Sequence, residues 1–206
     1  MGAEGRAFPS VKYFPVLLRL EGWECAVLGT AEAAGPYRAV LEGHGARVRV
    51  VVPPVRRGDL VGVRLVVAVG GDRAFHARLY RWARRRGVLC YAVDDPEHSD
   101  FIRPAVGERG PVVVAVSTGG ASPRMAQVLR DRCLGVVTEA DVRLAVLLGA
   151  LRPRLRQVLP DPAARGAFVD RLMASGVMAR LQEGDVETAR QMAEALLEAF
   201  RREVGP

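Results

Sequence analysis

Short apolar runs rich in β-branched residues alternate with helical patterns through the first two thirds of the chain, and this alternation constrains the fold most. The strand-like runs cover residues 25–29, 47–52, 65–69 and 88–93. Helical patterns lie between them at 30–43 and 74–86. Strands that alternate with helices form parallel βαβ units, so we predict an α/β fold with a Rossmann-like, doubly wound parallel sheet.

A further apolar run at 111–116 precedes a helical pattern at 125–133, and we expect this pair to continue the alternation. From Asp141 onward the β-type runs disappear. Helical spacing instead covers 140–151, 163–175 and 186–202, with breaks at the Pro160-Asp161-Pro162 and Gly184-Asp185 segments. We therefore predict a small helical domain at the carboxyl terminus. Residues 1–10 are expected to be frayed.

Composition favours a folded protein, because half of the 206 residues are apolar. The longest apolar runs fall far short of the roughly 20 residues that a membrane span needs, and no signal-peptide layout precedes them. A cytoplasmic location without membrane contact is the prediction. The net charge is +7, and Lys12 is the only lysine. Arginine suits carboxylates and phosphates, so an acidic ligand or nucleic acid could explain this charge, and so could genome composition alone.

Cysteine and histidine are sparse. The three cysteines are Cys25, Cys90 and Cys133, and the three histidines are His44, His76 and His98. An odd, scattered set of cysteines without a C-x-x-C pair predicts buried free thiols and no disulfide framework. We expect His44 and His76 to be solvated and His98 to be an ordinary loop residue. No permanent metal site is predicted, although a metal could pass through as substrate.

Two of the predicted strands end in groups that can do chemistry. The run 88–93 stops at Asp94-Asp95-Pro96, which places Asp94 at the carboxyl end of a strand. The run 111–116 is followed by Ser117-Thr118-Gly119-Gly120, and then by Ser122 as a helix N-cap with Pro123 as the first helical residue. Ligands of open α/β sheets gather at the carboxyl ends of strands, and a glycine-rich loop before a helix suits an anion. This stretch is therefore predicted to form one wall of a site.

The order of these motifs resembles the precorrin-2 dehydrogenase and sirohydrochlorin ferrochelatase family, the siroheme synthase amino-terminal module. The similarity covers roughly residues 10–135 and is most specific in YAVDDPEHSDFIRPAVGERGPVVVAVSTGGASPRM. It implies a homodimer with a Rossmann-like NAD-binding-type domain at 1–111, a dimerisation segment at 112–139 and a helical domain at 140–206. It also implies an anionic tetrapyrrole substrate.

The resemblance further implies roles for individual residues. Asp94 takes the place of the family's catalytic carboxylate, which serves both the dehydrogenation of precorrin-2 and the insertion of Fe²⁺ as a substrate into sirohydrochlorin. The expected NAD-binding residues are Gly29, Thr30, Ala31, Glu32, Ala33, Val52, Pro53, Gly70 and Gly71. The expected substrate-binding residues are Ser117, Thr118, Gly119, Gly120, Ser122 and Arg109.

The first glycine turn departs from the family pattern. Ala31 stands where relatives have a glycine that lets the backbone approach a pyrophosphate. A helix that begins near Ala31 would contain Pro36, and an interior proline costs about 3 kcal/mol. Gly35 and Pro36 therefore predict a late helix start, which would withdraw the positive end of the helix from the phosphates and weaken NAD binding.

Two alternatives remain open at this level. A chelatase-only or non-catalytic tetrapyrrole-binding relative would keep the fold without the redox step. A nucleic-acid-binding protein would use the basic helix that contains Arg78, Arg81, Arg84, Arg85 and Arg86, but such a face is more often simply solvated, and the chain has no nucleic-acid motif.

Overall fold

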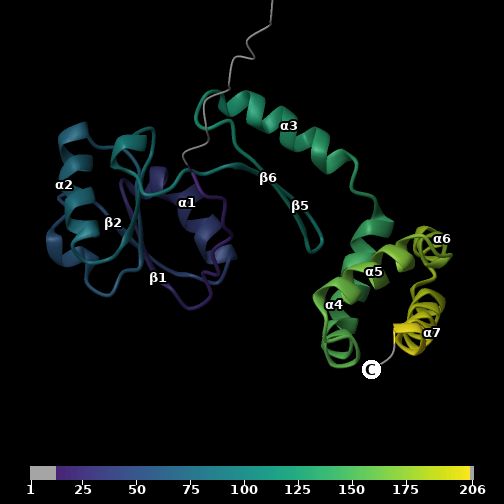
Figure 1. Cartoon of the computed structure of the whole chain (residues 1–206). Helices are drawn as coiled ribbons and strands as arrows, with labels where there is room; N and C mark the ends of the chain where they lie inside the picture. Colours follow the sequence, from purple (N-terminus) through teal and green to yellow (C-terminus); the bar gives the residue numbers. More distant parts are fainter. Residues whose placement is uncertain (1–12, 205–206) are drawn as a thin grey trace, which may run out of the picture. The chain divides into compact units, whose positions relative to one another are not determined.

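The computed structural model describes residues 13–204, so the expectation for residues 1–10 lies outside the described part. The chain divides between Arg103 and Pro104 into two compact units. Figure 1 shows the elements of each unit along the chain.

The first unit is a four-stranded sheet in the order β2-β1-β3-β4, and every neighbouring pair is parallel. Its strands are β1 (Glu24–Leu28), β2 (Arg47–Val51), β3 (Leu65–Ala68) and β4 (Leu89–Ala92). The connections carry α1 (Ala31–Gly43), the short 3-10 helix η1 (Arg57–Leu60) and α2 (Arg73–Arg84). The parallel, Rossmann-like sheet expected from the alternating pattern is confirmed.

The central strands β1 and β3 are buried along nearly their whole length, which explains why they are continuously apolar. One face of the sheet packs with Ala34 and Leu41 of α1. The opposite face packs with Leu79 and Ala83 of α2. Covering both faces in this way makes the sheet doubly wound.

The outer edge of β4 is covered by the segment that follows it. After the 3-10 helix η2 (Pro96–His98), the Asp100 amide donates to the Cys90 carbonyl at 2.8 Å, and the Asp100 carboxylate accepts from the Cys90 amide at 2.9 Å. The Ser99 hydroxyl accepts from the Ala92 amide, also at 2.9 Å. The strand's outward polar groups are thus paired within the same chain.

Helix α1 begins at Ala31, so the predicted late start at Gly35 and Pro36 is wrong. Thr30 is the N-cap, and its hydroxyl accepts a hydrogen bond from the Ala33 amide at 3.3 Å. Pro36 lies inside the helix. The cap and the packing of the buried Ala34 and Leu41 against the sheet offset the cost of the interior proline.

The second unit begins with a hairpin of β5 (Ala105–Arg109) and β6 (Val112–Val116), paired antiparallel in a sheet of their own. The run at 111–116 therefore does not extend the parallel sheet, and β5 was not predicted from the sequence. Gly110 makes the turn with a φ of 56°. The boundary expected at residue 111 thus lies between two strands that pair with each other. Helix α3 (Pro123–Gly135) packs on the hairpin, where Gly107 leaves room for Arg130 and Leu134.

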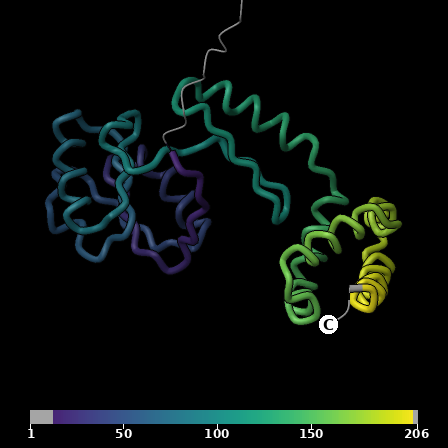
Figure 2. The backbone as a smooth tube through the Cα atoms, in the orientation of Figure 1, coloured from purple at the N-terminus to yellow at the C-terminus, as the bar shows by residue number. Residues whose placement is uncertain are grey.

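Four further helices form the rest of this unit and are visible as the green-to-yellow end of the trace in Figure 2. They are α4 (Glu139–Val158), α5 (Pro162–Met173), α6 (Val177–Glu183) and α7 (Val186–Val204). Their shared core includes Leu147, Leu172, Leu181 and Leu197, and the rings of Phe168 and Phe200 meet edge to face at 5.8 Å. The helical carboxyl-terminal region is confirmed. None of the helices between residues 13 and 204 is both long and apolar enough to span a membrane.

Candidate functional site

The carboxyl ends of β1 and β3 form the point at which the sheet's connections diverge. From β1 the chain moves through α1 to β2, and from β3 it moves through α2 to β4 on the other side. Ligands of open α/β sheets bind at such a point. A cleft of about 570 Å³ lies here, within the range of about 300–1,000 Å³ that is typical of small-molecule sites.

Close backbone approach shapes this cleft, which we call the switch-point cleft. A Cβ atom on Gly29 would lie 2.6 Å from the Val69 carbonyl oxygen, so only glycine fits between β1 and β3. A Cβ atom on Gly71 would lie 2.6 Å from Cδ1 of Phe75. The amino terminus of α1 also opens here, because its N-cap Thr30 lines the cleft. Glycine turns beside a helix amino terminus form a cradle that fits the pyrophosphate of a dinucleotide.

The structure brings most of the expected NAD-binding residues together. Six of the nine expected residues are part of the lining of the switch-point cleft: Gly29, Thr30, Ala33, Pro53, Gly70 and Gly71. Ala31, Glu32 and Val52 are not part of its lining. Sequence reasoning missed Phe75 and Arg78, which reach the cleft from α2.

A second cleft, of about 470 Å³, shares Gly70 and Gly71 with the first and contains Asp94. We call it the Asp94 cleft. Asp94 is exposed, and it is the only residue other than glycine with a positive φ, 60°, among those described. Aspartate tolerates this left-handed conformation better than most residues, but such conformations still cluster at functional sites. The two clefts adjoin along one loop.

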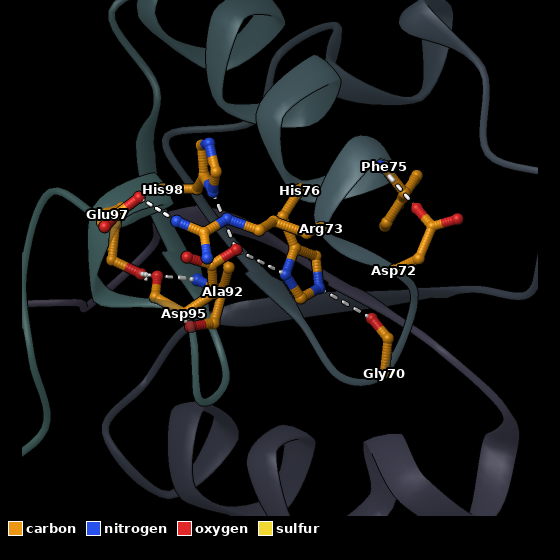
Figure 3. A network of polar contacts seen from close by, with 10 residues as sticks. Gly70, Asp72, Arg73, Phe75, His76, Ala92, Asp95, Glu97 and His98 are labelled. Atoms are coloured by element: carbon orange, nitrogen blue, oxygen red, sulfur yellow. Dashed lines mark hydrogen bonds and ion pairs between the residues drawn. The ribbon is translucent and has the colours of Figure 1, made fainter.

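Asp95, which directly follows Asp94 in the sequence, lies at the centre of a network of polar contacts. Figure 3 shows this network around Asp95. Its Oδ2 atom lies 3.1 Å from Nδ1 of His76 and 2.7 Å from Nδ1 of His98. The other ring nitrogen of His76, Nε2, lies 3.0 Å from the Gly70 carbonyl oxygen. Burial of the Asp95 carboxyl raises its pKa, but the hydrogen bonds from His98 and His76 outweigh burial, so the net pKa is below its usual value.

Several expectations about single residues are wrong. His76 is buried, with 6% of its surface exposed, although it was expected to be solvated. Its place was visible in the sequence, because His76, Leu79 and Ala83 share one helix face at spacings of three and four. Cys133 is exposed, whereas Cys25 and Cys90 are buried as expected. Burial raises the pKa of Cys90 to about 12, and nearby Asp100 contributes further.

His98 is also more than an ordinary loop residue, because it holds Asp95 and contacts the Tyr80 ring edge to face at 6.2 Å. His44 is exposed at the end of α1, where its Nδ1 lies 2.7 Å from the Val40 carbonyl oxygen. Among residues 13–204, no three His, Cys, Asp or Glu side chains are grouped so that they could hold a metal ion.

The loop from Ser117 to Ser122 belongs to the second unit and is closed by its own hydrogen bonds. The Ser122 amide donates to the Thr118 hydroxyl at 3.0 Å, and that hydroxyl donates to the Ser122 carbonyl at 3.1 Å. The Gly119 amide donates to the Ser117 hydroxyl at 3.1 Å. Ser122 is the N-cap of α3, with its hydroxyl accepting from the Met125 amide, as the sequence predicts. The loop is thus preformed at a helix amino terminus.

Two features are less suited to binding than the sequence implies. The Arg109 guanidinium donates to the Val137 carbonyl, which ties β5 to the segment between α3 and α4. On α2, Arg78 lies over the rings of Phe75 and Trp82, and Arg84 lies over Tyr80, each at 5.7 Å. These rings are already in contact with arginines of the same helix, which does not favour base stacking on them.

These features define the first unit as an α/β domain of the dinucleotide-binding type, followed by a hairpin and helical unit. Three family models match in the same order. A model described as putative NAD(P)-binding matches residues 16–105, the sirohaem biosynthesis protein central model matches 109–132, and the sirohaem synthase dimerisation region matches 142–197.

The siroheme synthase of Methylococcus capsulatus is 36% identical to the chain, over 93% of this chain and 45% of the relative. That of Nitrosococcus oceani is 31% identical, over 91% and 44%. A solved structure of SirC, precorrin-2 dehydrogenase, matches with a TM-score of 0.65 at 17% identity, covering 89% of this chain and all of that one. The chain thus matches siroheme synthases over three successive regions, and it spans less than half the length of these two curated relatives.

Proposed function

We propose that the protein is a precorrin-2 dehydrogenase, which uses NAD to oxidise precorrin-2 to sirohydrochlorin. The observation that carries this proposal is that the switch-point cleft and the Asp94 cleft share Gly70 and Gly71. A cofactor held in the first cleft is therefore next to a carboxylate in the second. Oxidation by hydride transfer with loss of a proton needs a hydride acceptor and a base close to the same substrate atoms.

NAD fits the switch-point cleft. The glycine at position 29 allows close approach, Thr30 places the amino terminus of α1 at the cleft, and Pro53 lines the wall after β2. The bound cofactor supplies a hydride acceptor. Because α1 begins at Ala31, its positive end is not withdrawn, so the late helix start no longer argues against NAD binding, although Ala31 still stands in place of a glycine.

Asp94 is the proposed base. It stands exposed at the cleft and accepts no hydrogen bond from any residue in the described range, so its carboxylate is available to take a proton. As a hydride leaves a ring carbon of precorrin-2, Asp94 accepts the proton that the substrate loses with it. The neighbouring Asp95 is unsuited to this role because both histidines already occupy it.

The substrate carries several carboxylates, and the loop before α3 offers one position for an anion. Gly119 and Gly120 have no Cβ atoms to block approach, and no atom lies within 4 Å of where these would be. We propose that Ser117, Thr118, Gly119, Gly120 and Ser122 bind a substrate carboxylate. The amides of Gly119 and Ser122 already donate within the loop, so the proposed donors are the Gly120 amide and the hydroxyls of Ser117 and Ser122, which only accept hydrogen bonds there. Arg109 is a weaker candidate because of its contact with Val137.

We propose a homodimer. In the part of the chain that the structure describes, neither β5 nor β6 pairs with a further strand, and Val106 and Val113, each 43% exposed, lie on the face opposite α3. The sequence places the dimerisation segment at 112–139, whereas the family model described as a dimerisation region matches 142–197. Sedimentation of variants with charges at Val113 or on the exposed Val146 of α4 would separate the two regions.

Iron insertion into sirohydrochlorin is a second candidate activity. The carboxylates of Asp94 and Glu97 both line the Asp94 cleft, and they favour a passing contact with Fe²⁺ as substrate. Glu97 is also paired with Arg73, so it would have to release this partner first.

The test is a titration of the full chain with NAD, followed by fluorescence, together with absorbance of sirohydrochlorin formed from precorrin-2 and NAD. We expect saturable binding and turnover that depends on NAD. Chelation is measured separately by adding Fe²⁺ to sirohydrochlorin. Binding without turnover would support a non-catalytic tetrapyrrole-binding relative, and chelation alone would support the chelatase-only reading.

A further inference from the structure

The His76 ring connects two loops that sequence reasoning treated as independent. Its Nε2 faces the Gly70 carbonyl after β3, and its Nδ1 faces the Asp95 carboxylate after β4. Both partners accept hydrogen bonds, so both bonds form together only when each ring nitrogen carries a proton. The side chains of His76 and Asp95 are 7% and 12% exposed, so their contact is largely shielded from water.

Gly70 borders both clefts, and Asp95 directly follows Asp94 in the chain. The backbone at Asp94 is held on two sides. The Val93 amide donates to the Ala68 carbonyl at 3.0 Å, and the Asp95 amide donates to the Ala92 carbonyl at 3.1 Å. Neither bond fixes the Asp94 loop to the glycine loop at Gly70 and Gly71. The His76 bridge does.

We propose that His76 and Asp95 are positioning residues, which lock the Asp94 loop to the glycine loop so that NAD binding sets the position of the Asp94 carboxylate. This proposal rests on the proposed function, because it assigns the bridge to the same pair of clefts. The bridge does not touch the reacting atoms. It fixes the distance between the cofactor loop and the base, and a misplacement of about 1 Å in such a geometry can cost about 10²-fold in rate.

Two substitutions of His76 each remove one of its two hydrogen bonds. In His76→Asn the amide reaches about as far as Nδ1, so the contact with Asp95 is kept and that with Gly70 is lost. In His76→Gln the amide reaches about as far as Nε2, so the contact with Gly70 is kept and that with Asp95 is lost. We expect both variants to lower kcat by about 10²-fold and to leave KM for precorrin-2 unchanged.

His98→Gln is the matched control. It removes the other histidine contact to the same Asp95 oxygen, but His98 does not reach Gly70. A generic loss of loop stability would lower the melting temperature and kcat in all three variants alike. Under the proposal only the His76 variants lose kcat, while the melting temperature falls in His98→Gln as well. Equal kcat losses in the three variants would overturn the proposal.

Hydrogen exchange of the unmodified protein tests the coupling between the two loops and requires neither turnover nor a variant. On addition of NAD, backbone amides of residues 93–98 should become protected together with those near Gly70. Protection near Gly70 without protection at 93–98 would refute the coupling while leaving the proposed function intact. A chain that binds no NAD would refute the proposed function. In that case, unchanged exchange at 93–98 in folded His76→Gln would refute the bridge separately.

Discussion

Asp94→Asn is the sharpest test of the candidate base, because the change removes the charge and little else. Asparagine tolerates a φ of 60° nearly as well as aspartate does, whereas alanine would carry part of the left-handed penalty of about 1–2 kcal/mol. The side chain is exposed and accepts no hydrogen bond from the described residues, so the free energy of unfolding should change by less than about 0.5 kcal/mol.

Turnover should fall much further. A general base contributes about 10²- to 10⁴-fold, which corresponds to about 3–5 kcal/mol in the activation barrier at 1.36 kcal/mol per tenfold change. The assay is sirohydrochlorin formation from precorrin-2 and NAD, with thermal unfolding of each variant measured beside it. Asp59→Asn is the matched control, since Asp59 is a carboxylate of the same unit that only accepts from the Arg56 amide at 2.6 Å.

Asp95→Ala, the obvious neighbouring control, is unsuitable because Asp95 holds both histidines. Retention of turnover within about twofold in Asp94→Asn would remove Asp94 from the chemistry, given the minimum of about 10²-fold expected for a base. A loss of stability above about 1.5 kcal/mol would instead assign it a structural role.

Three further predictions follow from single positions. Pro36→Ala restores an interior helical hydrogen bond and should stabilise the protein by about 1–2 kcal/mol in urea unfolding, with NAD affinity unchanged; a large gain in affinity would revive the late helix start. Gly29→Ala should lower the free energy of unfolding by about 1–3 kcal/mol and weaken NAD binding in a fluorescence titration. Gly35→Ala is the control, because no atom lies within 4 Å of its new Cβ, and it should stabilise α1 by about 0.5–1 kcal/mol. Similar effects of the two substitutions would contradict the close approach of Gly29 to Val69. The pKa of Asp95 in the folded protein lies below its usual value of 3.8, so its stabilising contribution is complete well above pH 3.8 and is lost as pH falls below that value. The free energy of unfolding of Asp95→Asn should therefore depend less on pH in the acid range than that of the unmodified protein. Parallel pH dependences would show that Asp95 is not the titrating group.

The parallel sheet could be predicted from the sequence because β1 and β3 are continuously apolar and lie between recognisable helices. The hairpin could not be predicted in the same way. Residues 111–116 look like another buried strand, and periodicity does not identify which strand a run pairs with. The Gly110-Pro111 turn signal was present, but β5 has Gly107, Glu108 and Arg109 in its pattern and was not recognised as a strand.

The site shows the same division between local and tertiary information. The position of Asp94 at the end of β4 follows from the apolar run and Pro96, but its left-handed backbone does not. The start of α1 was misjudged because the cost of Pro36 was local and visible, whereas the offsetting contacts of Ala34 and Leu41 with the sheet were tertiary. The His76 bridge joins residues 19 positions apart, and a single sequence gives no distance between them.

The covered edge of β4 also bears on how copies of this chain can meet. Ser99 and Asp100 occupy the amides to which a foreign strand would have to bind, so the parallel sheet cannot grow at that edge without first releasing its own loop. At the other edge, the Arg49 guanidinium on β2 reaches across to the carbonyls of Asp59 and Val61. At the β4 edge, a nascent chain that has folded its first unit therefore presents neighbouring chains with few open strand positions.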